Sequence, residues 1–406
     1  MAMAVQFGTD GIRGRAYEEI TTDLAYKLGR AVASVFNAPV FVGYDTRESS
    51  PALAAAVLCG LKDGGAKAIN LGYFTTPGVA VIAQQRSGVG IVVSASHNPY
   101  FDNGLKVLGL GGSKLDVATE QAVTDALNAA PSPANGEFAE TPIDASAEHD
   151  YAQHIASLVP GDISALSIVL DCANGAASNV AHELFEATGV SLTTINDAPD
   201  GKNINENCGS THVEALVAKV TELGADLGLA FDGDADRLIA VDKNGDVRDG
   251  DDLMILFALD FAERNKLGGG LVVTSMSNLG LHRAMRIAKT KVVETDVGDR
   301  NVLLALEENS WNFGGEQSGH LIFRDLAPTG DGLLTGLMLC DLVARRGPLD
   351  ELASAAWTRV PQRLINIAND LYKDDVVQSL FQELVASHNV DSVSYTHLTL
   401  PTILRV

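Results

Sequence analysis

The strongest chemical signal lies in the loop after the apolar run Ile91–Val93, which reads Ser-Ala-Ser-His-Asn-Pro over residues 94–99. A loop that follows a buried strand is a common place for reactive groups in α/β proteins, because the sheet holds its base while its tip reaches solvent or a ligand. Ser96 is the candidate reactive residue of this loop. His97 and Lys106 are near it in sequence and could orient the hydroxyl or neutralise a phosphate attached to it.

A second cluster of such residues follows another apolar strand, which ends at Phe231. Asp232, Asp234 and Asp236 alternate with small residues and are followed by Arg237. Three carboxylates can converge only if something cationic holds them, and oxygen ligands of this kind suit Mg²⁺, whose remaining positions are often filled by water and phosphate oxygens. Because Arg237 could also meet a substrate phosphate, the segment predicts a magnesium site beside a phosphate group.

Both loops also allow interpretations without chemistry. The first could be a strand followed by a turn at Asn98-Pro99 and a hairpin at Asn103-Gly104. The second could be a solvated acidic turn, or the start of an EF-hand calcium loop, which also opens with three alternating acidic residues. The EF-hand interpretation is disfavoured because that loop wants Gly and Glu where this chain has Arg237 and Lys243.

Two further loops carry weaker signals. Residues 314–320 read Gly-Gly-Glu-Gln-Ser-Gly-His, in which Glu316 and Ser318 offer the acceptors and donors that sugar hydroxyls require; an ordinary glycine-rich turn is the alternative. Residues 7–15 place two arginines, one of them Arg13, among glycines. Such a segment can bind an anion, or it can be an ordinary turn. The chain has no GxGxxG, GxxxxGK[ST] or GxSxG pattern, which argues against dinucleotide, P-loop and α/β-hydrolase sites.

These loops need a scaffold, and a strand-loop-helix pattern recurs three times along the chain. Strands alternating with helices predict an α/β protein whose sheets lean towards parallel and are covered on both faces. The expected strands are Val40–Tyr44, Ala66–Leu71, Val89–Val93, Leu166–Asp171, Val190–Ile195, Asp226–Phe231, Leu271–Thr274, Lys291–Thr295 and Trp311–Phe313. The expected helices are Pro51–Leu61, Asn179–Thr188, Leu279–Ala288 and Asp299–Glu308.

The repeats divide the chain into three similar mixed α/β units and a smaller fourth one. The segments Ala129–Pro142 and Lys243–Asp251 are rich in turn-forming residues and predict the boundaries between the units. Beyond Pro361 only a strand, Arg363–Ala368, and a helix, Asp374–His388, are expected, which is marginal for an independent core. The expected organisation is domain I over residues 1–140, domain II over 141–245, domain III over 246–360, a remnant of domain IV over 361–391 and a non-native tail over 392–406.

Composition excludes several classes of function. A chain of 406 residues has room for two to four domains. Its net charge of −23 opposes non-specific binding to nucleic acid or to anionic lipid. The four cysteines lie far apart, which argues against a disulfide framework and a zinc site. No apolar run approaches the ~20 residues that cross a bilayer, and the N-terminus lacks a secretory pattern, so a cytoplasmic location is expected.

Taken together and in this order, the segments FGTDGIRG, SASHNP, FDGDADR and GGEQSGH resemble the α-D-phosphohexomutase superfamily. The likeness covers Val5 to Ala368. It implies three similar α/β units and a smaller C-terminal domain around one central cleft, in agreement with the three repeats. Shorter matches favour the members that act on glucosamine phosphates; they are GKNIN at 201–205, CGSTH at 208–212, DGD at 249–251, VGDR at 297–300 and TGDG at 329–332.

The resemblance implies a phosphoserine mechanism. Ser96 would carry the phosphate, and one Mg²⁺ per chain would be bound by that phosphate together with Asp232, Asp234 and Asp236. Phospho-Ser96 would donate its group to glucosamine 6-phosphate, and the resulting bisphosphate would turn over and return its other phosphate, leaving glucosamine 1-phosphate. Glucosamine or glucose 1,6-bisphosphate would act as primer. Such a transfer depends mainly on positioning and on neutralising the phosphoryl oxygens.

The same resemblance implies roles for the remaining candidates. Glu316 and Ser318 would hold sugar hydroxyls, and Lys106 and His320 would handle protons. The groups surrounding the transferring phosphoryl would be Arg13, His97, Lys106 and Arg237. Small phosphosugars are the implied partners, with no nucleic acid and no membrane, and the oligomeric state stays open.

The chain departs from the family pattern near its C-terminus. The family's fourth domain carries a phosphate-binding loop of the form RxSGTEPxxR, and no such segment follows Pro361. Residues 392–406 resemble no part of the family and are left out of the expected fold. Since binding at the remote phosphate also positions the reacting end, impaired turnover is expected. The alternatives are a phosphomannomutase or phosphoglucomutase of the same superfamily, or a non-catalytic remnant that binds phosphosugar.

Overall fold

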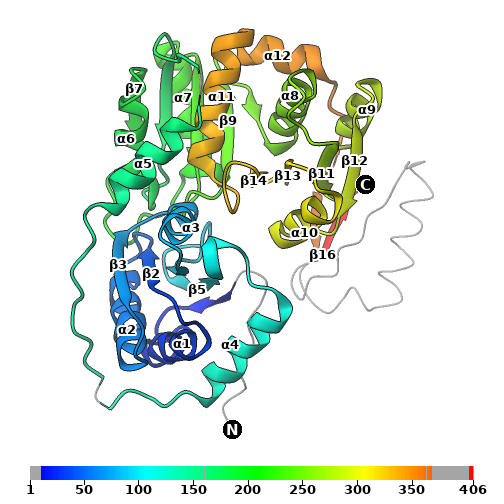
Figure 1. The fold of residues 1–406 in the computed structure, drawn as a ribbon. Helices are drawn as coiled ribbons and strands as arrows, with labels where there is room; N and C mark the ends of the chain where they lie inside the picture. The colour runs from blue at the N-terminus through cyan, green and yellow to red at the C-terminus, as the bar shows by residue number, and fades with distance from the viewer. Residues whose placement is uncertain (1–10, 135, 160, 363, 368–401, 406) are drawn as a thin grey trace.

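The computed structural model describes residues 11–134, 136–159, 161–362, 364–367 and 402–405. Within these ranges, three α/β units follow one another along the chain, each with its own sheet (Figure 1). No helix in the described ranges is long and apolar enough to cross a membrane. The expected three mixed units are confirmed, and the predicted helix at Asp374–His388 lies outside the described residues.

The first unit is a five-stranded sheet in the order β1-β5-β4-β2-β3. β2, β3 and β4 are parallel, whereas β1 and β5 run antiparallel to their neighbours. Its elements are β1 (Ile12–Arg15), α1 (Thr22–Val35), β2 (Val40–Tyr44), α2 (Ser50–Asp63), β3 (Ala68–Tyr73), α3 (Thr76–Gln85), β4 (Val89–Val93), β5 (Asp102–Leu108), the short 3-10 helix η1 (Leu110–Gly112) and α4 (Val117–Ala129).

Side chains of this sheet alternate between two cores, as the two-residue period of a strand requires. Val40 and Val42 of β2 belong to the core formed with α1, α2 and α4. Phe41 belongs to the core on the other face, which contains α3 and continues into the second and third units. The first unit is therefore joined to the rest of the protein through the α3 side of its sheet.

The second unit repeats this design with the strand order β10-β9-β8-β6-β7. β6, β7 and β8 are parallel, and β9 and β10 are antiparallel additions. Its elements are α5 (Ala147–Ser157), β6 (Ser167–Asp171), α6 (Ala177–Glu186), β7 (Ser191–Ile195), η2 (Gly209–Thr211), α7 (Glu214–Leu223), β8 (Leu227–Phe231), β9 (Leu238–Asp242) and β10 (Val247–Arg248).

The third unit has a four-stranded sheet in the order β12-β11-β13-β14. Its elements are α8 (Gly250–Glu263), β11 (Gly270–Thr274), α9 (Leu279–Ile287), β12 (Lys291–Thr295), α10 (Asp299–Asn309), β13 (Phe313–Gly315), β14 (Leu321–Phe323), α11 (Gly332–Arg346) and α12 (Leu349–Ala356). Helix α11 follows this sheet in sequence but packs on β8 and β9 of the second unit, as Figure 1 also shows. Because α11 packs on the sheet of the second unit, it fixes the second and third units against each other.

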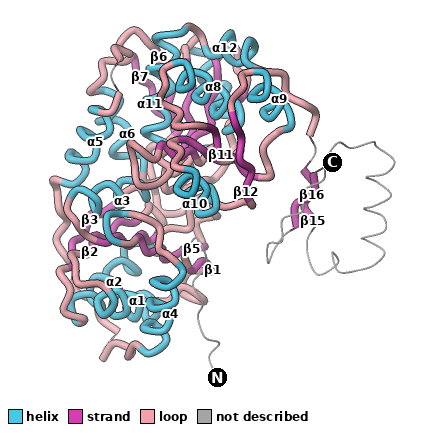
Figure 2. Tube along the Cα trace, turned by 45° about the vertical axis from the view of Figure 1, so that its right-hand side comes forward, coloured by secondary structure: helices cyan, strands magenta, loops and turns pink. Residues whose placement is uncertain are grey.

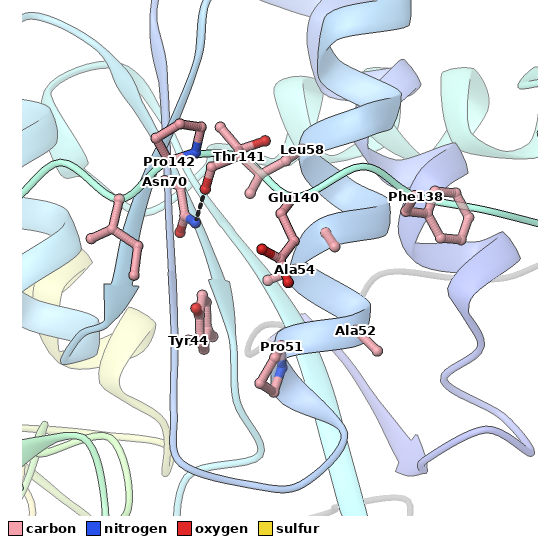
Figure 3. A pocket seen from close by; sticks show the side chains of 12 residues that line it. Tyr44, Pro51, Ala52, Ala54, Leu58, Asn70, Phe138, Glu140, Thr141 and Pro142 are labelled. Atoms are coloured by element: carbon pink, nitrogen blue, oxygen red, sulfur yellow. Dashed lines mark hydrogen bonds between the residues drawn. The ribbon is translucent and has the colours of Figure 1, made fainter.

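A segment that links the first two units crosses the edge of the first sheet. Asn70 on β3 donates a 2.8 Å hydrogen bond from Nδ2 to the carbonyl of Thr141. Between this segment and α2 lies a cavity of about 830 Å³, lined among others by Tyr44, Leu58 and Phe138 (Figure 3). None of the sequence-predicted site residues lines this cavity.

One alternative interpretation and the bounds of one expected strand differ from the structure. Asn103-Gly104 does not form a hairpin turn but lies inside β5, where Asn103 Nδ2 donates to the hydroxyls of Ser49 and Ser50. The strand expected at Trp311–Phe313 is Phe313–Gly315, shifted into a glycine pair. The sheets agree with the expected mixed units, because each unit adds antiparallel strands to a parallel centre.

A small two-stranded sheet lies outside the three larger ones (Figure 2). It pairs β15 (Leu364–Ile367) antiparallel with β16 (Thr402–Arg405), so part of the tail that was left out of the expected fold pairs with the strand expected near Arg363–Ala368. The physical reason is that the apolar and β-branched residues of these segments favour a strand, and a lone strand leaves its backbone groups unpaired.

Candidate active site where the three units meet

Ser96 lies in the loop that connects β4 to β5, and its side chain is 1% exposed. Its backbone adopts a left-handed conformation with φ of 53°, which is uncommon for a residue with a side chain. Ser96 Oγ donates a 2.6 Å hydrogen bond to Asp232 Oδ2 of the second unit and lies 3.3 Å from His97 Nδ1. The structure thus brings the predicted reactive serine to the predicted metal loop.

The three aspartates follow β8 in a tight turn, with Ala235 at φ 58°. In this turn one carboxylate oxygen from each of Asp232, Asp234 and Asp236 lies within 4.8 Å of the others. Gly233 lets the two loops touch, since a Cβ at this position would lie 2.5 Å from the carbonyl oxygen of Ser96. The close approach of serine and aspartates therefore depends on a glycine.

Cationic side chains from all three units surround the carboxylates. Lys106 Nζ of β5 lies 2.5 Å from Asp234 Oδ2, where it makes an ion pair. His320 Nδ1 of the third unit lies 3.6 Å from Asp236 Oδ2, and Arg237 Nε lies 3.8 Å from Asp236 Oδ1. The site consequently exists only when the three units are docked.

The aspartates fit a metal ion. The Oδ1 atoms of Asp234 and Asp236 are buried, and neither accepts a hydrogen bond from any residue within the described ranges. Burial, followed by the neighbouring charges of Asp236 and Asp234, raises the pKa of Asp232 well above its usual value. A bound cation would give the two Oδ1 atoms a partner. It would also offset the repulsion that opposes the negative charge of Asp232.

The two histidines of the site differ in protonation. Burial, with the positive charges of Arg237 and Arg13, lowers the pKa of His97 to about 4, so this ring is neutral at pH 7. Burial acts in the same direction on His320, but the neighbouring carboxylate of Asp236 and the charge of Asp299 raise its pKa to about 9. His97 can therefore accept a hydrogen bond from a serine hydroxyl, whereas His320 is a proton donor.

The two predicted arginines also lie at this site. Arg13 is on β1, directly opposite Gly104 of the neighbouring strand β5. The effect of Arg13 and Arg237 on the pKa of His97 places positive charge from both beside the loop that carries Ser96. The negative charges of Asp236, Asp232 and Glu316 raise the pKa of Arg237 further, although burial alone would lower it.

The predicted sugar-binding loop joins β13 to β14. Glu316 is 8% exposed, and its Oε1 accepts a 3.0 Å hydrogen bond from the backbone N–H of Gly298, while burial raises its pKa. Ser318 lies exposed on the same turn. The loop is attached to the second unit because Leu238 N–H donates to the carbonyl of Gly319 at 3.0 Å.

Two residues that sequence reasoning gave no role belong to the same network. Asp299 at the start of α10 pairs with Lys114 Nζ at 2.6 Å and with His320 Nε2 at 3.8 Å. Thr76 donates from Oγ1 to Asp234 Oδ2 at 2.5 Å. Asp299 lies in the VGDR segment, which could have pointed to it as a site residue. Nothing in the residues around Thr76 predicts its contact with Asp234.

Comparison with known proteins agrees with this architecture. The chain matches the three family models described as phosphoglucomutase/phosphomannomutase, alpha/beta/alpha domain I over residues 4–133, domain II over 149–245 and domain III over 249–360. The structure is similar to that of a phosphoglucomutase/phosphomannomutase family protein from Burkholderia thailandensis, with a TM-score of 0.81 and 25% identity over 100% of this chain and 93% of that one. The N-acetylphosphoglucosamine mutase of Aspergillus fumigatus, solved with GlcNAc-6P and magnesium, shares the fold with a TM-score of 0.67 and 19% identity over 99% of this chain and 91% of that one.

Relatives of known name are more similar in sequence. The phosphoglucosamine mutase of Rhodococcus opacus is 46% identical over 376 residues, which cover 89% of this chain and 84% of that protein. The phosphoglucosamine mutase of an Exiguobacterium species is 43% identical over 403 residues, which cover 95% of this chain and 89% of that protein. By fold, by family match and by identity, this chain belongs to the phosphoglucosamine mutase family of the phosphohexomutases.

Proposed function

We propose that this chain interconverts glucosamine 6-phosphate and glucosamine 1-phosphate through a phosphorylated Ser96. The observation that carries the proposal is the 2.6 Å hydrogen bond from Ser96 Oγ to Asp232, which puts the serine beside a carboxylate cluster fitted to a metal ion. The relatives named phosphoglucosamine mutase support this choice of sugar. The chain is accordingly an isomerase that moves a phosphoryl group within its substrate.

Each half-reaction moves one phosphoryl group. The bond between phosphorus and Ser96 Oγ breaks as a sugar hydroxyl oxygen bonds to phosphorus; the hydroxyl loses its proton and Ser96 Oγ regains one, leaving a sugar bisphosphate. After the sugar reorients, the same exchange runs in reverse with its other phosphate. Glucosamine or glucose 1,6-bisphosphate would load a dephosphorylated chain by the second half-reaction.

The chain's own residues supply charge and orientation for this transfer. Arg13 and Arg237 place positive charge beside the phosphoserine loop, and Lys106 holds Asp234. Asp232, Asp234 and Asp236 would hold one Mg²⁺ together with the Ser96 phosphate, and bound Mg²⁺ would neutralise charge on the phosphoryl oxygens. Phosphoryl transfer gains most from such positioning and charge neutralisation.

The sugar would be held on the other side of the phosphoryl group. Glu316 and Ser318 share a turn of the third unit, and we assign them to the sugar hydroxyls. His320, as an imidazolium between Asp236 and Asp299, is suited to donate a proton rather than to accept one. Lys106 is the other candidate for proton transfer.

The proposal is tested by Ser96→Ala. This variant should fold, carry no phosphate by intact-mass measurement and show no turnover with a bisphosphate primer. Ser113→Ala, which removes an exposed hydroxyl outside the site, is the matched control and should keep both phosphate and activity. Glucosamine, glucose and mannose phosphates are assayed side by side; turnover by Ser96→Ala at the wild-type rate would refute the mechanism, and a preference for glucose or mannose phosphate would refute the sugar assignment.

A further inference from the structure

A buried guanidinium lies directly beneath the phosphoserine loop. Arg47 follows β2 and is 0% exposed. Its Nε donates to Asp45 Oδ2 at 2.8 Å. Its other donors reach four backbone carbonyls: three in the loop between β4 and β5, namely Ser96 at 2.9 Å, Asn98 at 2.8 Å and Pro99, and that of Asp102 at the start of β5, at 3.1 Å.

This arrangement uses the full donor set of arginine. A guanidinium carries five N–H groups in a rigid planar fork. Arg47 makes five hydrogen bonds to five acceptors, one carboxylate and four carbonyls. Lysine would keep the charge but has only three donors on one atom, so it cannot replace this set.

The same network also holds the N–H group of Ser96. That N–H donates to Ser94 Oγ at 3.0 Å, and Ser94 Oγ donates to Asp45 Oδ2 at 2.6 Å. Asp45 is therefore bonded both to Arg47 and to Ser94, and both backbone groups of Ser96 lead back to one carboxylate. A residue in the left-handed region persists when its surroundings fix it in this way.

The second unit adds a further donor. Asn205 Nδ2 donates to the carbonyl of Ser96 at 2.9 Å and to that of Asn98 at 3.2 Å. Two of the four carbonyls held by Arg47 are thus also held across the interface between the units. The serine hydroxyl is fixed relative to Asp232 from both sides of that interface.

We propose that Arg47, assisted by Asn205, is a positioning residue for phosphoryl transfer, which fixes Ser96 Oγ in line with the aspartate cluster and makes no contact with the substrate. The inference rests on the proposed function of Ser96. Because the Arg47 side chain is fully buried, its loss should change the rate of transfer and leave substrate affinity unchanged. A residue that only stabilised the fold would change neither quantity per folded molecule.

The test compares Arg47→Lys with Arg86→Lys. Arg86 likewise makes several side-chain hydrogen bonds, in its case to Asp144, Asp150 and Ser146, and none of these partners belongs to the Ser96 loop. For Arg47→Lys we expect kcat to fall roughly 100-fold, the order reported for misplacement of a reacting group by about 1 Å, with KM within about twofold of wild type. The rate at which glucose 1,6-bisphosphate phosphorylates Ser96, followed by intact mass, should fall by the same factor, whereas Arg86→Lys should leave kcat, KM and this rate unchanged per folded protein.

A second variant covers the case in which Arg47→Lys does not fold. Asn205→Ala removes the shared donor to Ser96 and Asn98 and should lower kcat and the Ser96 phosphorylation rate together, again without changing KM. A folded Arg47→Lys variant with wild-type kcat would overturn the inference. If Arg47→Lys does not fold, wild-type kcat in Asn205→Ala would do so. A rise in KM without a fall in kcat would also overturn it. A wild-type chain that shows no phosphate on Ser96 and no turnover would instead overturn the proposed function.

Discussion

Gly319 offers a quantitative test of how the sugar loop is placed. It lies between Ser318 and His320 with φ of +92°, and a Cβ built on it would lie 2.1 Å from the carbonyl oxygen of Leu238. Real Cβ atoms do not approach other atoms closer than 3.0 Å, so the alanine variant must open this contact by about 0.9 Å. The hydrogen bond from Leu238 to the Gly319 carbonyl leaves the loop little freedom to move elsewhere.

Gly319→Ala should therefore displace Glu316 and His320 together. A shift of about 1 Å in a positioned group lowers turnover roughly 100-fold, and we expect a loss of this order in kcat/KM for glucosamine 6-phosphate. The positive φ adds a backbone strain of about 1–3 kcal/mol, which should lower the melting temperature as well. Both quantities are measured on the same preparation, with kcat corrected for the folded fraction.

Gly347→Ala separates strain from displacement. Gly347 has φ of +113°, but no heavy atom of the described residues lies within 4 Å of a Cβ placed there, and it ends α11 outside the site. Its alanine variant should lose stability and keep kcat/KM within about twofold of wild type. Wild-type kcat/KM in Gly319→Ala, or an equal loss in Gly347→Ala, would refute the assignment of this loop to substrate binding.

Three further substitutions test other contacts. Burial, followed by the charge of Asp249, raises the pKa of Asp251 from 3.8 to about 7. Its contribution to stability is therefore complete below pH 3.8 and is lost as the pH rises through 7, so the melting temperature of Asp251→Asn relative to that of wild type should rise between about pH 4 and pH 7. Lys106→Met leaves the buried carboxylate of Asp234 without its cation and should cost about 3–5 kcal/mol in urea unfolding and abolish turnover. Tyr151→Phe removes the 2.8 Å hydrogen bond to Asp331 and should cost about 1–3 kcal/mol with turnover per folded molecule preserved.

Each of these has an outcome that contradicts it. Parallel pH profiles for Asp251→Asn and wild type would show that this carboxyl is not protonated in the folded protein. Lys62→Met removes an exposed amine bonded to Thr141 and is the control for Lys106→Met; equal losses in the two would deny Lys106 its role. A Tyr151→Phe variant as stable as wild type would mean that Asp331 finds another donor.

Much of the scaffold could be predicted because its strands are continuous apolar runs. The predicted bounds of Val40–Tyr44, Val89–Val93 and Lys291–Thr295 agree with the observed strands. β5 was not expected because Asn103-Gly104 favours a turn, and that local preference is overridden by the hydroxyls of Ser49 and Ser50, about 50 residues earlier. Local preference also placed β13 two residues too early, before the glycine pair that the strand requires, since a Cβ at Gly314 would lie 2.6 Å from Val272 O.

Candidate site residues could be proposed from the sequence where the motif itself carries the chemistry. The structure brings Ser96 and Asp232 together as expected, although the two loops are far apart in sequence. Arg47 could not be found in this way, because its partners are carbonyl oxygens and any sequence presents carbonyls. Its role arises from a contact between residues about 50 positions apart, which no local pattern encodes.

The burial of Ser96 bears on how the proposed phosphoserine would form. Protein kinases bind their targets as flexible, extended segments, and the loop around Ser96 is held at both backbone groups and is only 1% exposed at the serine. To reach another protein's active site, this loop would have to give up the bonds that shape it. Under the proposed mechanism, the donor would be a small molecule that comes to the serine, so the level of such phosphate donors, rather than a signalling kinase, would set the phosphorylated fraction of the protein.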